Sequence, residues 1–180
     1  MNDLSSSEVA PLSNSVNGCL LVDIGGEIFG ISIRSVKEVI ELEDVTQVPM
    51  CTSTVSGVIN VRGSVVPVID AAKRLGLRNT NSYDKYSCIV LYDCIDESTH
   101  EAITIGVLVN RVRAIEELSG EELAGAPYFG AHIPVSFILH MARVNEQVFI
   151  VLDMASMLSI TSINEEIVDY QKELFKNILS

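Results

Sequence analysis

The chain has 180 residues, 48% of them hydrophobic, which is enough for one ordinary domain or two small ones. Its 24 acidic residues against 12 basic ones give a formal net charge of −12, and no local run of lysines or arginines offsets that charge. This balance disfavours nucleic-acid binding.

Neither a membrane-spanning segment nor an export signal is visible. No stretch approaches the roughly 20 uninterrupted apolar residues that a spanning helix needs. The amino terminus lacks the basic start and apolar middle of a signal peptide. We therefore expect a cytoplasmic protein with no direct membrane insertion. The four cysteines form no CxxC pair, so we expect free thiols, and Cys19 and Cys88, which each open an apolar run, should be buried.

Short strands separated by turns are predicted along most of the chain. Residues 1–16 are rich in serine and asparagine and are expected to be a mobile tail. A glycine pair separates the first two strands, and a short helix is predicted at 35–41. The strands are predicted at residues 19–24, 27–33, 58–61, 65–69, 86–93, 102–109, 112–118, 133–141 and 147–152. The chain should be mostly β.

The end of the chain, residues 161–180, departs from this pattern. Ser162 and Glu165 have the spacing of a capping box at a helix start. Apolar residues then recur at helical intervals, at Ile163, Ile167, Tyr170, Leu174 and Ile178. We interpret this segment as an amphipathic helix that closes a core, with docking to a partner as the alternative.

An internal repeat organises the strands. Residues 19–22 resemble 88–91, 30–37 resemble 106–113, and 66–72 resemble 149–155, in the same order in both halves. Within these segments Gly30 corresponds to Gly106 and Asp70 to Asp153. Two similar units, one in each half of the chain, fit two small closed or nearly closed barrels, with a cleft between them as a possible binding place.

No constellation for catalysis stands out. Asp70 and Asp153 each sit between a strand and a helix, where a carboxylate caps free N–H groups. The richest cluster of metal-ligand types lacks the tight pairs of a zinc site, and the isolated histidines have no nucleophile beside them. That cluster consists of Cys88, Asp93, Cys94, Asp96, Glu97 and His100. We expect no enzyme activity, no cofactor and no metal.

The hairpin at residues 57–69 carries an arginine at its tip. Arg62 and Gly63 separate two apolar strands, and strand alternation should bury the neighbours while the guanidinium points outward. An exposed arginine can anchor a carboxylate or an amide of another protein. The alternative is a solvated loop charge.

Four segments resemble the CheW family of chemotaxis coupling proteins. NVRGSVVPVIDAAKRLGL is similar to the family's Asn-x-Arg-Gly turn with the following strand and helix, and LLVDIGGEIFGISIRSVKEVIE is similar to its opening hairpin. ITIGVLVNRVRAIEEL and EQVFIVLDMASML extend the resemblance, which covers about residues 17–160.

The resemblance implies an all-β fold with minor helices, made of two tandem five-stranded SH3-like barrels within residues 17–160. It implies a non-catalytic adaptor that couples methyl-accepting chemoreceptors to a CheA-type histidine kinase. Such an adaptor binds the kinase's regulatory domain and the receptor's cytoplasmic tip, and so lies at the inner face of the membrane in receptor arrays. Matching positions assign a receptor-facing role to Val36, Glu38 and Arg62, a turn-holding role to Asn60 and Gly63, and a role in coupling to Gly57.

Two alternatives stay open. One is a CheW-like scaffold of another chemosensory or pilus-motility pathway. The other, from a different class, is a metal- or small-molecule-binding β protein that uses the cleft between the barrels and the cysteine and carboxylate cluster.

Overall fold

The computed structural model describes residues 18–48, 54–78, 82–118, 123–124 and 133–179, and for residues 123–124 and 166–175 it describes the backbone. The predicted tail at 1–16 lies outside the described residues, as does Cys51.

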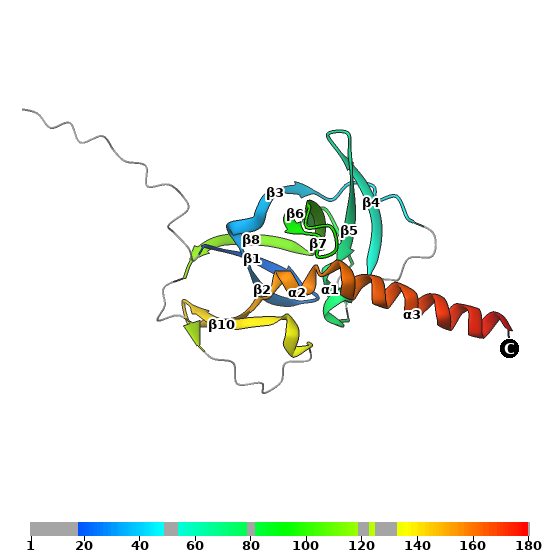
Figure 1. Cartoon of the computed structure of the whole chain (residues 1–180). Helices are drawn as coiled ribbons and strands as arrows, with labels where there is room; N and C mark the ends of the chain where they lie inside the picture. The colour runs from blue at the N-terminus through cyan, green and yellow to red at the C-terminus, as the bar shows by residue number, and fades with distance from the viewer. Residues whose placement is uncertain (1–17, 49–53, 79–81, 119–122, 125–132, 180) are drawn as a thin grey trace, which may run out of the picture.

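Two sheets make up the fold (Figure 1). One has the strand order β3 (Val36–Glu41), β6 (Cys88–Ile95), β7 (Ala102–Val109), β5 (Ser64–Asp70) and β4 (Val55–Val61). The other has the order β8 (Arg111–Glu117), β1 (Gly18–Ile24), β2 (Glu27–Ser32), β11 (Gln147–Leu152), β10 (Ile138–Val144) and β9 (Leu123–Ala124). The helices are α1 (Ala71–Leu75), α2 (Met154–Met157) and α3 (Ile160–Leu179), with 3₁₀ turns η2 (Ile33–Ser35) and η4 (Val135–Phe137).

Each sheet closes into a small barrel. In the first sheet, the chain beyond β3 returns so that Thr46 pairs with Val58 of β4. In the second, β9 follows β8 and pairs with β10, with Ala124 opposite Met141. The strands β3 to β7 therefore form a contiguous barrel, and β1, β2 and β8 to β11 form a split barrel built from the two ends of the domain. The prediction of two small barrels is confirmed.

The two halves of the chain are related strand by strand. Gly30 of β2 lies opposite Val151 of β11 in a parallel pair, and Gly106 of β7 lies opposite Val68 of β5 in another. The predicted equivalence of Gly30 with Gly106 is confirmed by this register. Each barrel takes strands from both halves, because β1 and β2 pair with the later strands while β6 and β7 pair with the earlier ones.

The register corrects one detail of the repeat. Leu21 lies opposite Gly30 and Leu91 lies opposite Gly106, so Cys19 corresponds to Ile89 and not to Cys88. A slip of one residue moves a side chain to the other face of a strand. Cys19 is accordingly 1% exposed, and burial raises the pKa of its thiol to about 11. Cys88 is only half-buried, so its predicted burial is wrong.

Apolar side chains fill the space between the two sheets. This central cluster includes Leu20 and Val22 of β1 with Val90 and Tyr92 of β6. Each barrel also has its own smaller core, around Val68 in the contiguous barrel and around Phe149 in the split barrel. The largest core is therefore shared, and the region proposed from sequence as a binding cleft is occupied by packed side chains.

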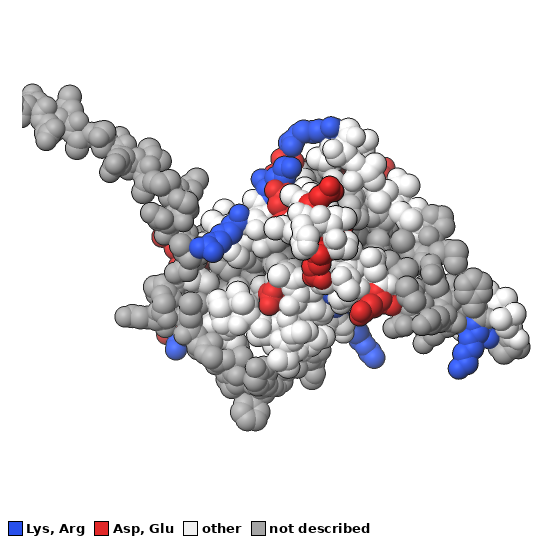
Figure 2. All heavy atoms as spheres, in the orientation of Figure 1, with Lys and Arg blue, Asp and Glu red and all other residues white. Residues whose placement is uncertain are grey.

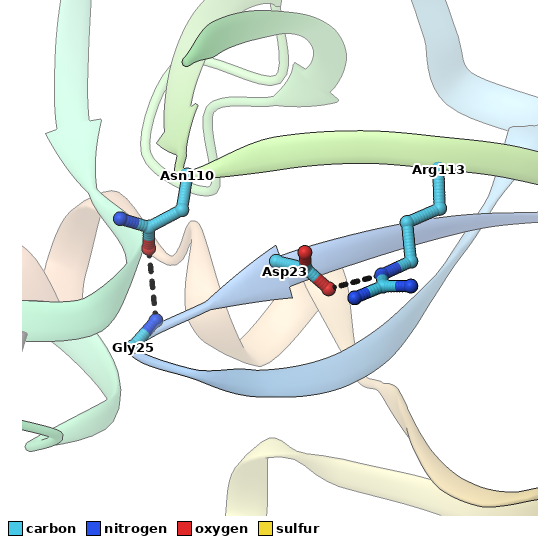
Figure 3. A network of polar contacts seen from close by, with 4 residues as sticks. All are labelled: Asp23, Gly25, Asn110 and Arg113. Carbon is cyan, nitrogen blue, oxygen red and sulfur yellow. Dashed lines mark hydrogen bonds and ion pairs between the residues drawn. The ribbon is translucent and has the colours of Figure 1, made fainter. Parts of the chain in front are cut away.

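A short junction carries the chain from one sheet to the other (Figure 3). Asn110 is the single residue between β7 and β8, and its Oδ1 accepts a hydrogen bond from the Gly25 N–H at 2.9 Å. Its own N–H donates to the carbonyl of Asp23, and the Asp23 carboxylate pairs with Arg113 at 2.6 Å. The first hairpin is thereby fastened to the point where the chain changes sheets.

Two predicted elements differ from the structure. The helix predicted at 35–41 is wrong: Ser35 ends the turn η2 and Val36–Glu41 form the strand β3. In this strand Val36, Glu38 and Ile40 are half-buried in strict alternation with exposed neighbours, and the segment pairs with β6. The strand predicted at 133–141 begins at Ile138, since η4 precedes it.

The observed helix caps match those predicted from the sequence, except at the last helix, α3. Asp70 Oδ1 accepts from the Lys73 N–H at 3.1 Å and Asp153 Oδ1 from the Ser156 N–H at 3.2 Å, which confirms both predicted caps. The capping box predicted at Ser162 is wrong, because α3 begins at Ile160 and the side chain of Ser159 accepts from the Ser162 N–H.

The helix α3 meets the core at its start and is exposed at its end. Ile163 is buried in the central cluster, as the core-closing interpretation expects. Ile178 and Leu179 are 73% and 84% exposed, and Figure 1 shows the helix extending away from the barrels. The core-closing interpretation therefore holds for the first turns and fails at the end.

The hairpin turn between β10 and β11 is strained. Asn145 and Glu146 have φ of 49° and 65°, whereas the corresponding turn between β4 and β5 has glycine at its second position. Two-residue turns of this kind favour Asn-Gly. We expect Glu146→Gly to raise the free energy of unfolding by about 0.5 kcal/mol, the relief of the left-handed strain less the entropy of an added glycine. Urea denaturation measures this change.

The matched control is Gly63→Glu, which places the same side chain at the corresponding turn position and should destabilise the protein. A Glu146→Gly variant less stable than its parent contradicts the interpretation.

Candidate functional site

The β4–β5 hairpin ends in a two-residue turn. Val61 pairs with Ser64, and the residues between them, Arg62 and Gly63, both have positive φ, at 49° and 85°. Asn60 Oδ1 accepts a hydrogen bond from the Gly63 N–H at 2.9 Å. This bond links the two residues to which the family resemblance assigns a turn-holding role.

The arginine at the tip has a partner that sequence proximity does not reveal. Arg62 Nη2 lies 2.8 Å from Oε2 of Glu38, 24 positions upstream in β3. The hydrogen bond to this carboxylate and its negative charge raise the pKa of the Arg62 guanidinium. The side chains differ in exposure, 73% for Arg62 and 28% for Glu38. The guanidinium therefore reaches from solvent to a carboxylate that is mostly covered.

This ion pair joins β3 to the tip of the β4–β5 hairpin, although β3 and β4 are not neighbours in the order of their sheet. β3 and β4 lie at opposite ends of that order, and the barrel closes where Thr46 and Val58 exchange backbone hydrogen bonds of 2.9 and 2.8 Å. Glu38 Oε1 is buried without a hydrogen-bond partner among the described residues. Among the described residues Arg62 is the cation paired with this partly buried carboxylate, so Arg62 both fixes the tip and compensates the Glu38 charge.

Val36 and Gly57, the other two predicted site residues, lie apart from this group. Val36 is half-buried, opens β3 and packs on the central cluster. Gly57 has φ of 145°, and a Cβ at this position would collide with the backbone of Thr46. The structure thus brings together Glu38, Asn60, Arg62 and Gly63, while Gly57 lies where the barrel closes.

The tip offers both charge and apolar surface. Arg62 uses one of its five N–H donors in the ion pair, so the rest can bind carboxylate or carbonyl groups of another molecule. Val65 of β5 is 70% exposed and Val39 of β3 is 39% exposed. Figure 2 shows basic and acidic side chains side by side over β3 and the β4–β5 hairpin.

The split barrel carries a similar frame with different side chains. By the repeat, Ile115 and Val148 correspond to Val39 and Val65, and they too are exposed, at 65% and 56%. Ala114 and Asn145 stand where the contiguous barrel has Glu38 and Arg62. The ion pair therefore belongs to one barrel only. The repeat in the sequence could have revealed this difference, had the halves been compared residue by residue.

The cysteine and carboxylate cluster does not assemble into a ligand set. Among residues 18–48, 54–78, 82–118 and 133–165, no three His, Cys, Asp or Glu side chains come together as metal ligands do. Asp96 Oδ1 instead accepts from the backbone and hydroxyl of Ser98, at 2.8 and 2.6 Å, within a turn. Burial, with the charges of Asp93 and Asp96, raises the pKa of the Cys94 thiol to about 11.

Within the described residues, none of the helices combines the length and the apolar character that a membrane-spanning helix needs.

Residues 18–162 match the CheW-like domain family. The chain is 28% identical to the chemotaxis protein CheW of Treponema pallidum over 138 residues, which cover 76% of this chain and 78% of that protein. It is 25% identical to CheW of Klebsiella aerogenes over 140 residues, covering 78% and 80%.

A solved structure agrees in fold. The scaffolding protein TtCheW from Thermoanaerobacter tengcongensis superposes with a TM-score of 0.69 at 21% identity, covering 81% of this chain and 89% of that one. The family match spans both barrels and ends within the first turns of α3. The chain therefore belongs to the CheW-like domain family.

Proposed function

We propose that this protein is a non-catalytic adaptor that couples methyl-accepting chemoreceptors to a CheA-type histidine kinase. It acts in the cytoplasm, at the inner face of the membrane, through its place in receptor arrays. The observation that carries the proposal is the exposed Arg62 guanidinium held at a hairpin tip by Glu38. Family membership supplies the context of chemotaxis.

The receptor tip binds the surface formed by Arg62, Glu38 and the hairpin. Arginine is enriched at interface positions that contribute most of the binding energy. An arginine already held by an ion pair loses less conformational freedom on binding than a free one. Asn60 and Gly63 keep the turn in shape, and Val36 supports β3 from the central cluster. The kinase's regulatory domain binds a different part of the molecule.

The first test reverses the charge at the tip. Arg62→Glu should weaken binding to a receptor-tip fragment by at least about tenfold, while affinity for the kinase's regulatory domain stays close to that of the parent. The variant should also melt at a lower temperature, because it places two carboxylates together at Glu38. Two titrations and a thermal melt measure these effects.

A charge swap separates the roles of fold and contact. The double variant Glu38→Arg with Arg62→Glu restores an ion pair, so the melting temperature should recover while receptor binding stays weak. If Arg62→Glu binds the receptor fragment as the parent does, the arginine is a solvated loop charge. If the swap restores receptor binding, Arg62 acts only by holding the hairpin.

We propose that Gly57 supports coupling through the fold and not by direct contact. Gly57→Ala should lower the free energy of unfolding by at least about 2 kcal/mol, because the methyl group meets the Thr46 backbone at a φ of 145°. The matched control is Gly63→Ala, which is strained but has open space around it and should cost about 1 kcal/mol. Equal stability of the two variants in urea denaturation contradicts this assignment.

A further inference from the structure

The helix α1 carries a buried arginine that the hairpin site does not use. Arg74 is 5% exposed. Its Nε donates to the Met157 carbonyl at 2.8 Å, and its Nη2 donates to the Ser156 carbonyl at 3.3 Å and to the Ser162 hydroxyl at 3.0 Å. A guanidinium removed from water is costly unless its donors are satisfied, and these bonds satisfy several of them.

These partners of Arg74 come from the last third of the chain. Met157 and Ser156 belong to α2, Ser162 belongs to the first turn of α3, and the Phe137 ring of η4 lies 4.7 Å from the guanidinium carbon. By the repeat, Met157 is the counterpart of Arg74 itself, so α1 and α2 meet where the two halves face each other. One side chain thus joins the contiguous barrel to the carboxyl-terminal helices.

The two ends of α3 differ in how they are held. At the start, Ser159 caps the helix and Ile163 is buried in the central cluster. At the other end, Ile178 and Leu179 are exposed, and the family match stops at residue 162. We call residues 164–179 the C-terminal arm. Among the described side chains, those at the first turns of α3 bind the barrels and can set the direction in which this arm leaves them.

We propose that Arg74 is the positioning residue of the C-terminal arm. By binding the end of α2 and the start of α3 together, it sets the direction of the arm relative to both barrels. Its loss frees the arm and leaves the barrels folded. The proposal is independent of which partners bind the hairpin.

Residual dipolar couplings of backbone amides in the full chain test this directly. In the parent protein, the arm should fit the same alignment as the strands of both barrels. In Arg74→Met, the couplings of the arm should fall by about twofold or more through motional averaging, while those of the strands stay unchanged. Ser162→Ala removes only the bond to α3 and should give a smaller fall.

The control is Lys73→Met, which removes the neighbouring, exposed cation of α1 and should behave as the parent. Arm couplings that stay at parental size in Arg74→Met overturn the proposal, as do arm couplings already averaged in the parent. Should Arg74→Met fail to fold, Ser162→Ala decides the matter, and unchanged arm couplings in that variant overturn the proposal.

Discussion

The exchange of strands between the two halves is the constraint on which the rest of the structure depends. The chain crosses between the sheets through the three residues of η2 and again through Asn110 alone, so neither crossing has slack. Because each barrel needs strands from both halves, the central cluster can form only when both are in place. Asn110 ties the second crossing to the turn at Gly25, and the sheets are thereby fixed to each other as well as closed. The hairpin that carries Arg62 is presented by this frame.

The two barrels share a backbone plan and differ in what they expose. Backbone pairing and buried apolar residues define the plan, and neither depends on the side chains at the hairpin tips. The tips are therefore free to diverge. In the contiguous barrel a charged pair closes the gap between β3 and the hairpin, whereas the split barrel has Ala114 and Asn145 at the equivalent places. The difference between the halves locates the specialised surface better than either half does alone.

Local patterns in the sequence predicted local structure well. Strands at 102–109 and 147–152 have the bounds expected from their alternation, and Asp70 caps a helix where its position after a strand predicts it. The helix predicted at 35–41 is wrong because so short a run of Val, Lys, Glu and Ile residues fits the helical period and the strand period equally well. The sequence predicts the repeat, but its alignment of the first strand is shifted by one residue. Apolar side chains on both faces of that strand hide the register. The partner of Arg62 could not be predicted, since barrel closure alone brings Glu38 to it.

The equivalence of the halves bears on how such a domain can arise and be divided. A single repeat contains every type of strand that the two sheets use, but it cannot complete either barrel by itself. Two identical copies that exchange strands would form the same pair of barrels as a symmetric dimer, the arrangement that domain swapping produces. The present chain then corresponds to that dimer after fusion, with residues 79–81 near the point where the copies join. A break in the backbone there leaves each piece without a finished barrel, so the pieces can regain their structure only by associating with each other.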